Sequence, residues 1–226
     1  MTTKNMNGSF MMGREDNILY FPNNIDVRMC PKNGMSTLKE AYRKVKYLPA
    51  DEKLASRIEN VSKKCDMFDI PFRKGSYRIA VRRDPIDRFK SACEFIMDAR
   101  SYYIKEGKFL PDIALELDQV IDDLEQGKYR DNHFYTQTYY MGLPQEYDMV
   151  YHIDELPKLL AFLQDATETD KEITHIHENK TKLKLYNGAI DDQHMTKLRN
   201  FYLKDYINGW CKQDDFIPLR FPQEYQ

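Results

Sequence analysis

Cysteine is scarce in this chain, and its spacing excludes two kinds of structure. The 226 residues include 4 cysteines, which lie far apart at Cys30, Cys65, Cys93 and Cys211. A zinc site usually needs a close pair of cysteines, and a disulfide framework is typical of short, cysteine-rich secreted chains. We therefore expect no metal site, and we interpret the four thiols as small buried residues.

Long apolar runs and a targeting signal are also missing. No segment approaches the roughly 18 apolar residues of a membrane-spanning helix. Residues 1–16 are polar with interspersed glycine and methionine, without the basic and then apolar layout of a secretory signal. The sequence thus predicts a cytoplasmic protein without a membrane span. We expect residues 1–20 to form a flexible tail.

A strong net charge is absent, but the charges are unevenly distributed. The formal net charge is -2 and the pI is about 6.2, which argues against a protein that mainly coats nucleic acid. Residues 28–90 nevertheless hold 17 Lys and Arg against 8 Asp and Glu, whereas residues 111–170 hold 3 against 14. We expect an anionic ligand in the N-terminal half and no nucleic-acid partner. Salt-dependent binding of a polynucleotide by the basic half is the alternative.

The chain has no internal repeat and no low-complexity linker, which predicts one domain over residues 21–226. Alternating or clustered apolar residues predict strands at residues 25–29, 77–82 and 147–153. Helical spacing predicts helices at residues 36–48, 85–107, 111–124, 155–163 and 192–210. Strands separated by helices indicate an α/β fold with a central parallel sheet flanked by helices. Ligands of such sheets bind at the carboxyl ends of the strands.

The first segment with chemical potential follows the strand at residues 25–29. Residues 30–38 read Cys-Pro-Lys-Asn-Gly-Met-Ser-Thr-Leu. Gly34 lets backbone N–H groups approach a phosphate, Ser36 or Thr37 is the expected N-cap, and Lys32 adds a mobile positive charge. Neither G-x-x-x-x-G-K-[ST] nor G-x-G-x-x-G is present, so this is not an NTPase or dinucleotide loop. An ordinary turn with an exposed lysine is the alternative.

The second segment follows the strand at residues 77–82. Asp84 is an N-cap candidate and Pro85 suits the first helical position. Arg83 at the strand end and Ser91 two turns into the helix can converge on a second phosphate, since arginine presents a planar fork of donors. We interpret Arg88 as part of an ion pair on the helix surface. Together the two segments predict a clamp for a ligand with two anionic ends.

These segments resemble the nucleotide-binding motifs of sulfotransferases that use 3′-phosphoadenosine 5′-phosphosulfate (PAPS), and are most similar to the Golgi-type carbohydrate sulfotransferases. The resemblance implies a single-domain, three-layer, P-loop-like fold. It also implies that one group of residues binds the 5′ side of PAPS, namely Lys32, Asn33, Gly34, Met35, Ser36, Thr37 and Leu38. Arg83 and Ser91 would bind the 3′-phosphate. Asn179, Lys180 and Thr181 would fold over the nucleotide, and His133-Phe134 with Gln137 is a weaker similarity.

The implied reaction is in-line transfer of a sulfuryl group from PAPS to a hydroxyl of a carbohydrate acceptor. Lys32 would stabilise charge on the departing oxygen. His133 is the preferred base because an unperturbed imidazole has a pKa near 6.5, but a carboxylate such as Glu94 or Glu40 is an open alternative. A sulfuryl group carries less negative charge than a phosphoryl group, so no magnesium site is expected. A nucleotide-binding module without turnover and a P-loop-like kinase are the competing interpretations.

Overall fold

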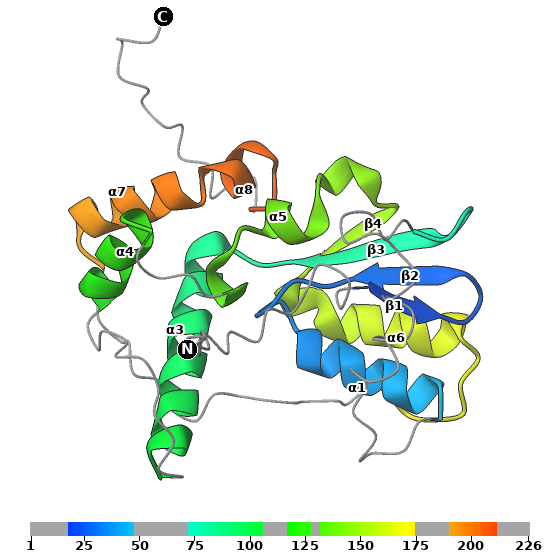
Figure 1. The fold of residues 1–226 in the computed structure, drawn as a ribbon. Coiled ribbons are helices and arrows are strands. Elements are labelled where there is room, and N and C mark those ends of the chain that lie inside the picture. Colours follow the sequence, from blue (N-terminus) through cyan, green and yellow to red (C-terminus); the bar gives the residue numbers. More distant parts are fainter. Residues whose placement is uncertain (1–17, 48–71, 106–116, 128–131, 175–189, 212–226) are drawn as a thin grey trace, which may run out of the picture.

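The computed structural model describes residues 18–47, 72–105, 117–127, 132–174 and 190–211, apart from the side chains of residue 132 and residues 97–105. Within these ranges the chain is a mixed α/β fold built on one four-stranded sheet (Figure 1). Asn179, Lys180 and Thr181 lie outside the described residues, and so does the start of the helix predicted at residue 111.

The sheet has the strand order β1-β2-β3-β4. These strands are β1 (Ile18–Phe21), β2 (Ile25–Arg28), β3 (Tyr77–Arg82) and β4 (Met149–His152). The pairs β2–β3 and β3–β4 are parallel, which confirms the predicted parallel strands. β1 pairs antiparallel with β2 and was not predicted. The predicted tail of residues 1–20 is therefore wrong at residues 18–20, where Ile18 and Leu19 are buried in β1.

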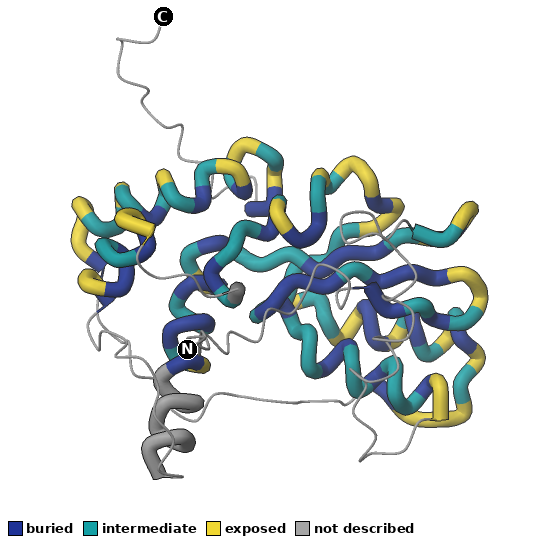
Figure 2. The backbone as a smooth tube through the Cα atoms, in the orientation of Figure 1, coloured by how far each residue is buried: buried dark blue, intermediate teal, exposed yellow. Residues whose placement is uncertain are grey.

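Two helices cover one face of the sheet, α1 (Met35–Val45) and α6 (Leu156–Ala166). Leu38, Ala41 and Val45 recur at helical spacing and pack with Val27 of β2 and Ile79 of β3 into one apolar cluster. Figure 2 shows β2 and β3 as buried in their centres. Burial on this face is what holds the start of α1 against the carboxyl end of β2.

The opposite face of the sheet is covered by α5 (Gln137–Met141), which joins Ala80 of β3 in a second cluster with Trp210. A third cluster connects α3 (Pro85–Lys105), α4 (Leu117–Glu125) and α7 (Asp192–Phe201). No helix among the described residues is long and apolar enough to cross a membrane.

The helix predicted at residues 192–210 is two helices, α7 and α8 (Leu203–Ile207). The helix is interrupted at Tyr202, the C-cap of α7, whose backbone has φ -95° and ψ 16°. The break brings both Tyr202 and Asp205 into the interior, where each is fully buried. A continuous amphipathic pattern could not reveal it. Among the described residues, three short 3-10 helices were also not predicted, η2 (Asn132–Phe134), η3 (Pro144–Glu146) and η4 (Ile153–Glu155).

Candidate functional site

The two predicted segments lie side by side at one edge of the sheet. β2 and β3 are parallel neighbours, so the loops that follow them leave from the same edge. The guanidinium Nη1 of Arg83 donates a hydrogen bond of 3.0 Å to the carbonyl oxygen of Lys32. The first and second segments are therefore in direct contact.

A buried glutamine joins the two segments from the other side. Gln137 is fully buried at the start of α5, and its Oε1 accepts from Asn33 Nδ2 at 2.7 Å and from the Arg83 N–H at 3.0 Å. Its Nε2 donates to the Arg83 carbonyl at 2.9 Å. Asn33 Nδ2 also donates to the Val81 carbonyl, so the Asn33 side chain connects the loop to β3. Its Oδ1 is buried without a hydrogen-bond partner among the described residues.

The first turn after β2 is tight, and α1 begins earlier than predicted. The Asn33 N–H donates to the Cys30 carbonyl at 3.1 Å, and Lys32 (φ 70°) and Gly34 (φ 77°) are both left-handed. The N-cap is Gly34, so the prediction of Ser36 or Thr37 is wrong. The cause is the left-handed pair, which turns the chain into helix before either hydroxyl is reached. A Cβ on Gly34 would lie 3.0 Å from Leu156 Cδ2, so both backbone conformation and packing favour glycine here.

The side chains of the first segment divide into two groups. Leu38 is fully buried and its N–H donates to the Gly34 carbonyl, so it has no donor left for a ligand. Met35 is partly buried and packs against the same sheet cluster. Thr37 is also buried, whereas Ser36 and Lys32 are partly exposed. The backbone N–H groups of the first turn of α1 have no partner within the helix, and they carry the positive end of its dipole. This end of α1 is suited to an anionic group.

The surroundings of Lys32 disfavour the protonated, charged form of its side chain. Burial, reinforced by the nearby Arg83 guanidinium, lowers the pKa of Lys32 to about 8, and Glu94 partly opposes the effect. Burial also lowers the pKa of Arg83, against the carboxylates of Asp87 and Glu94. Two cations held close together in a partly buried site are stabilised by an anion that binds between them.

The second segment continues into α3 as predicted, but one residue differs. Asp84 Oδ1 accepts from the N–H groups of Ile86 and Asp87 at 2.8 and 3.0 Å, which confirms Asp84 as the N-cap. Arg88 is fully buried, so its interpretation as a helix-surface ion-pair residue is wrong. Its guanidinium donates to backbone carbonyls, those of Pro31, His133, Phe134 and Tyr135. Arg88 is buried because its guanidinium supplies donors to these loop carbonyls, which would otherwise be unpaired.

One stripe of α3 faces the first segment. Arg88, Ser91 and Phe95 are spaced three and four residues apart, which places them on one helix face. Arg88 Nη1 contacts the Pro31 carbonyl, and Lys32 Nζ lies 4.3 Å from the centroid of the Phe95 ring. Ser91 lies between these two contacts along the helix and is partly exposed. Its position is compatible with the predicted phosphate contact.

His133 lies in η2, beside the same aromatic ring. Its imidazole is 4.7 Å from the Phe95 ring, centroid to centroid, so Lys32 and His133 both contact Phe95. Of the two carboxylates left open as bases, Glu94 acts on the charges of Lys32 and Arg83. Glu40 is bound instead by the Arg43 guanidinium on α1, which lowers the Glu40 pKa and makes it a weaker base.

Asp205 is a structural residue of the site that the sequence did not single out. It is fully buried in α8, and its two carboxylate oxygens accept from the N–H groups of Gln137 and Thr138, each at 2.8 Å. Burial raises the pKa of Asp205, while Arg88 and these N–H groups oppose that effect. Asp205 thus fixes the start of α5 and with it Gln137. A lone aspartate in a helical pattern gives no signal of this role.

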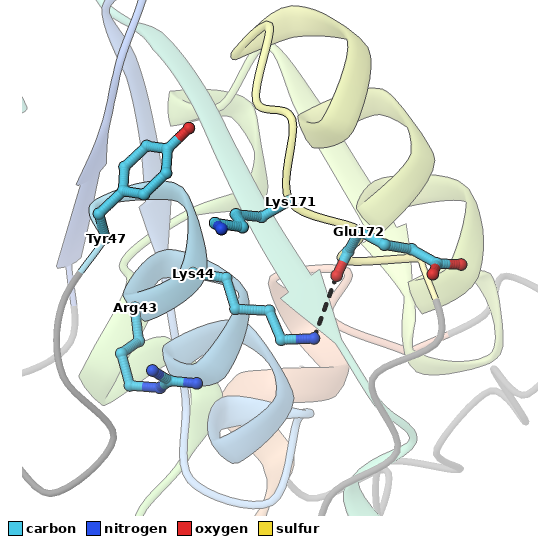
Figure 3. Close-up of a pocket in the computed structure, with 5 residues that line it drawn as sticks. All are labelled: Arg43, Lys44, Tyr47, Lys171 and Glu172. Carbon is cyan, nitrogen blue, oxygen red and sulfur yellow. Dashed lines mark hydrogen bonds between the residues drawn. The ribbon is translucent and has the colours of Figure 1, made fainter.

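A pocket lies at the other end of α1. It measures about 560 Å³ and is lined by Arg43, Lys44, Tyr47, Lys171 and Glu172 (Figure 3). Lys44 Nζ donates to the Glu172 carbonyl, Lys171 lies over the Tyr47 ring, and Arg43 is bound to Glu40. None of the predicted site residues lines it. Its cations already have protein partners, so size alone does not make it the better candidate.

Asp118, Asp191 and His194 place one possible metal-ligand atom each within 4.8 Å of one another, between α4 and α7. His194 Nδ1 lies 2.7 Å from Asp191 Oδ2, which is the distance of a charge-assisted hydrogen bond. The prediction of no metal stays a prediction.

Comparison with protein-family profiles, with curated proteins and with solved structures gave no match to this chain.

Proposed function

We propose that the protein is a sulfotransferase that moves the sulfuryl group of PAPS to a hydroxyl of a carbohydrate acceptor. The proposal includes a P-loop-like arrangement of the fold. The observation that carries it is the hydrogen bond between Arg83 and the Lys32 carbonyl, because it brings the two segments predicted to bind anions into contact. A ligand with a phosphate at each end of an adenosine would bridge them. PAPS supplies the activated sulfuryl group.

In this proposal each residue has a defined task, and Lys32 has two. Arg83 and Ser91 hold the 3′-phosphate, while the first-turn N–H groups of α1, with Ser36 and Lys32, hold the 5′ side. His133 takes the proton of the acceptor hydroxyl as the new O–S bond forms. Lys32 stabilises the negative charge on the oxygen released when the old S–O bond breaks. Asn33 and Gln137 keep the two segments at a fixed separation through their hydrogen bonds.

The experiment is turnover of radiolabelled PAPS with a panel of glycans, comparing the unchanged protein with Lys32→Ala and His133→Ala. We expect both variants to lose at least about 100-fold in kcat. Lys39→Ala, which removes a lysine of α1 outside the site, is the matched control. Full activity of Lys32→Ala would refute the assignment of Lys32.

Two other functions remain candidates. A nucleotide-binding module would bind adenosine 3′,5′-bisphosphate tightly without transfer to any acceptor. A P-loop-like kinase would consume ATP in the presence of magnesium. The sequence lacks the second glycine of the kinase-type phosphate loop, which favours the sulfotransferase.

A further inference from the structure

Phe95 is an exposed aromatic residue in the middle of a charged site. Its side chain is 40% exposed, although α3 offers a buried apolar face that Phe89, Cys93 and Ile96 occupy. The roles assigned above give Phe95 no task. Exposed aromatic surface that adjoins polar catalytic groups is typical of a place where a ligand ring stacks.

Two candidate catalytic groups contact this one ring. Lys32 Nζ lies 4.3 Å from the Phe95 centroid, and the His133 ring lies 4.7 Å from it at an interplanar angle of 39°. A molecule stacked on the exposed part of Phe95 would therefore lie within about one ring's width of both the ammonium and the imidazole. His133 is held in place from behind, because its carbonyl accepts from the buried Arg88.

We propose that Phe95 and His133 form a shelf, the Phe95 shelf, that binds the acceptor through a flat ring with an apolar face. The hydroxyl on that ring would then be presented to His133 and Lys32. The inference rests on the proposed function for its chemistry, but it adds the residue that selects the acceptor. It predicts that ring-bearing alcohols bind and that open-chain alcohols of similar size do not.

The shelf adjoins the proposed nucleotide contacts at one residue. Arg83 and the first turn of α1 do not involve the Phe95 ring, whereas Lys32 Nζ contacts it. Removing that ring should therefore weaken acceptor binding much more than nucleotide binding.

The test measures binding of two probes with rings, methyl β-galactoside and 4-nitrophenol, and of 1-hexanol as the open-chain probe. Binding is followed by saturation-transfer NMR, and adenosine 3′,5′-bisphosphate is titrated separately by calorimetry. We expect Phe95→Leu to weaken binding of at least one ring probe about tenfold and to change nucleotide affinity less than twofold. Phe95→Tyr should restore ring binding.

Tyr77→Leu is the matched control, because Tyr77 is an aromatic residue of similar exposure, 38%, at the start of β3. Unchanged ring binding in Phe95→Leu, or no ring binding by the unchanged protein, would overturn the shelf. An equal loss of nucleotide affinity would also overturn it, since the ring would then hold the adenine. Ring binding that depends on Phe95, without any nucleotide binding, would uphold the shelf and refute the sulfotransferase.

Discussion

At the scale of single residues, the site consists of partly buried charges whose energetics favour an anionic ligand. Lys32 and Arg83 lie together, and burial lowers the pKa of both. Without a ligand this arrangement costs stability, because a partly desolvated cation beside another cation is unfavourable. Sites that trade stability for function are common.

If the proposed function holds, the charge of Lys32 makes nucleotide binding depend on pH. Because the Lys32 pKa is about 8, the unliganded protein loses this charge as pH rises through that value. The ligand phosphates are already largely ionised at pH 7, so affinity for adenosine 3′,5′-bisphosphate should fall about tenfold between pH 7 and pH 9. Calorimetric titration at several pH values measures this. Lys32→Met should bind weakly at every pH, and a fall that persists in this variant would contradict the assignment.

The buried amide of Gln137 should matter more for stability than its polar type suggests. Gln137→Leu would leave the N–H and C=O of Arg83 without their partners, so we expect a loss of ~2–4 kcal/mol in the free energy of unfolding. Urea denaturation measures it. Gln119→Leu, on the exposed face of α4, should change stability by less than about 0.5 kcal/mol.

At the scale of elements, the sequence predicted what depends on local pattern and missed what depends on distant partners. The bounds of β3 and the N-cap Asp84 followed from alternation and from the Asp-Pro pair. β1 was missed because Ile18 to Phe21 is a run of four apolar residues without alternation, and its place is fixed by pairing with β2. The contact of Asp205 with Gln137 joins residues 68 positions apart, and no local pattern encodes it.

The start of α1 provides a direct test of element geometry. Gly34→Ala would force a Cβ to within 3.0 Å of Leu156 and 3.1 Å of Ile153 in a left-handed conformation. Gly127→Ala has a similar φ of +65° and nothing within 4 Å of the new Cβ. We expect Gly34→Ala to be less stable than Gly127→Ala by ~1–3 kcal/mol in thermal unfolding. Equal effects would show that the contact with η4 and α6 is unimportant.

The ion pairs of His194 between α4 and α7 should stabilise the protein most at mildly acidic pH. His194 faces Asp118 at 3.5 Å, Asp122 at 3.7 Å and Asp191 at 2.7 Å. These carboxylates raise the His194 pKa, so its stabilisation is fully present below about 6.5 and is lost as pH rises through the higher folded-state pKa. The Asp191 pKa is lowered, so its contribution requires a pH above about 3.8.

The melting temperature of His194→Gln should therefore fall furthest below that of the unchanged protein between about pH 4.5 and 6.5. The difference should shrink toward pH 8. Scanning calorimetry across this range measures both. A difference that does not vary with pH would contradict the ion-pair explanation. Saturable binding of added Zn²⁺ by the unchanged protein would indicate a metal site instead.

At the scale of the whole molecule, Arg88 connects parts that lie far apart in the sequence. It lies on α3, contacts the carbonyl of Pro31 after β2, and donates to three consecutive carbonyls from His133 to Tyr135. Its guanidinium is also 5.4 Å from the Tyr202 ring. Lysine cannot replace a fully buried arginine with so many partners without loss of stability, because its side chain carries a single ammonium group.

We expect Arg88→Lys to lower the free energy of unfolding by ~3–5 kcal/mol, because one ammonium cannot reach all of these carbonyls. Arg199→Lys on α7 is the control and should be nearly neutral. Chemical denaturation followed by circular dichroism measures both. Equal stability of the two variants would mean that the carbonyls find water in place of Arg88.

The hydrogen bonds that Asp205 accepts from α5 make the first and second segments depend on a distant helix. Asp205 on α8 fixes Gln137, which in turn is hydrogen-bonded to Asn33 of the first segment and to Arg83 of the second. A substitution that detaches α8 should therefore disturb the proposed nucleotide site without changing any residue in it.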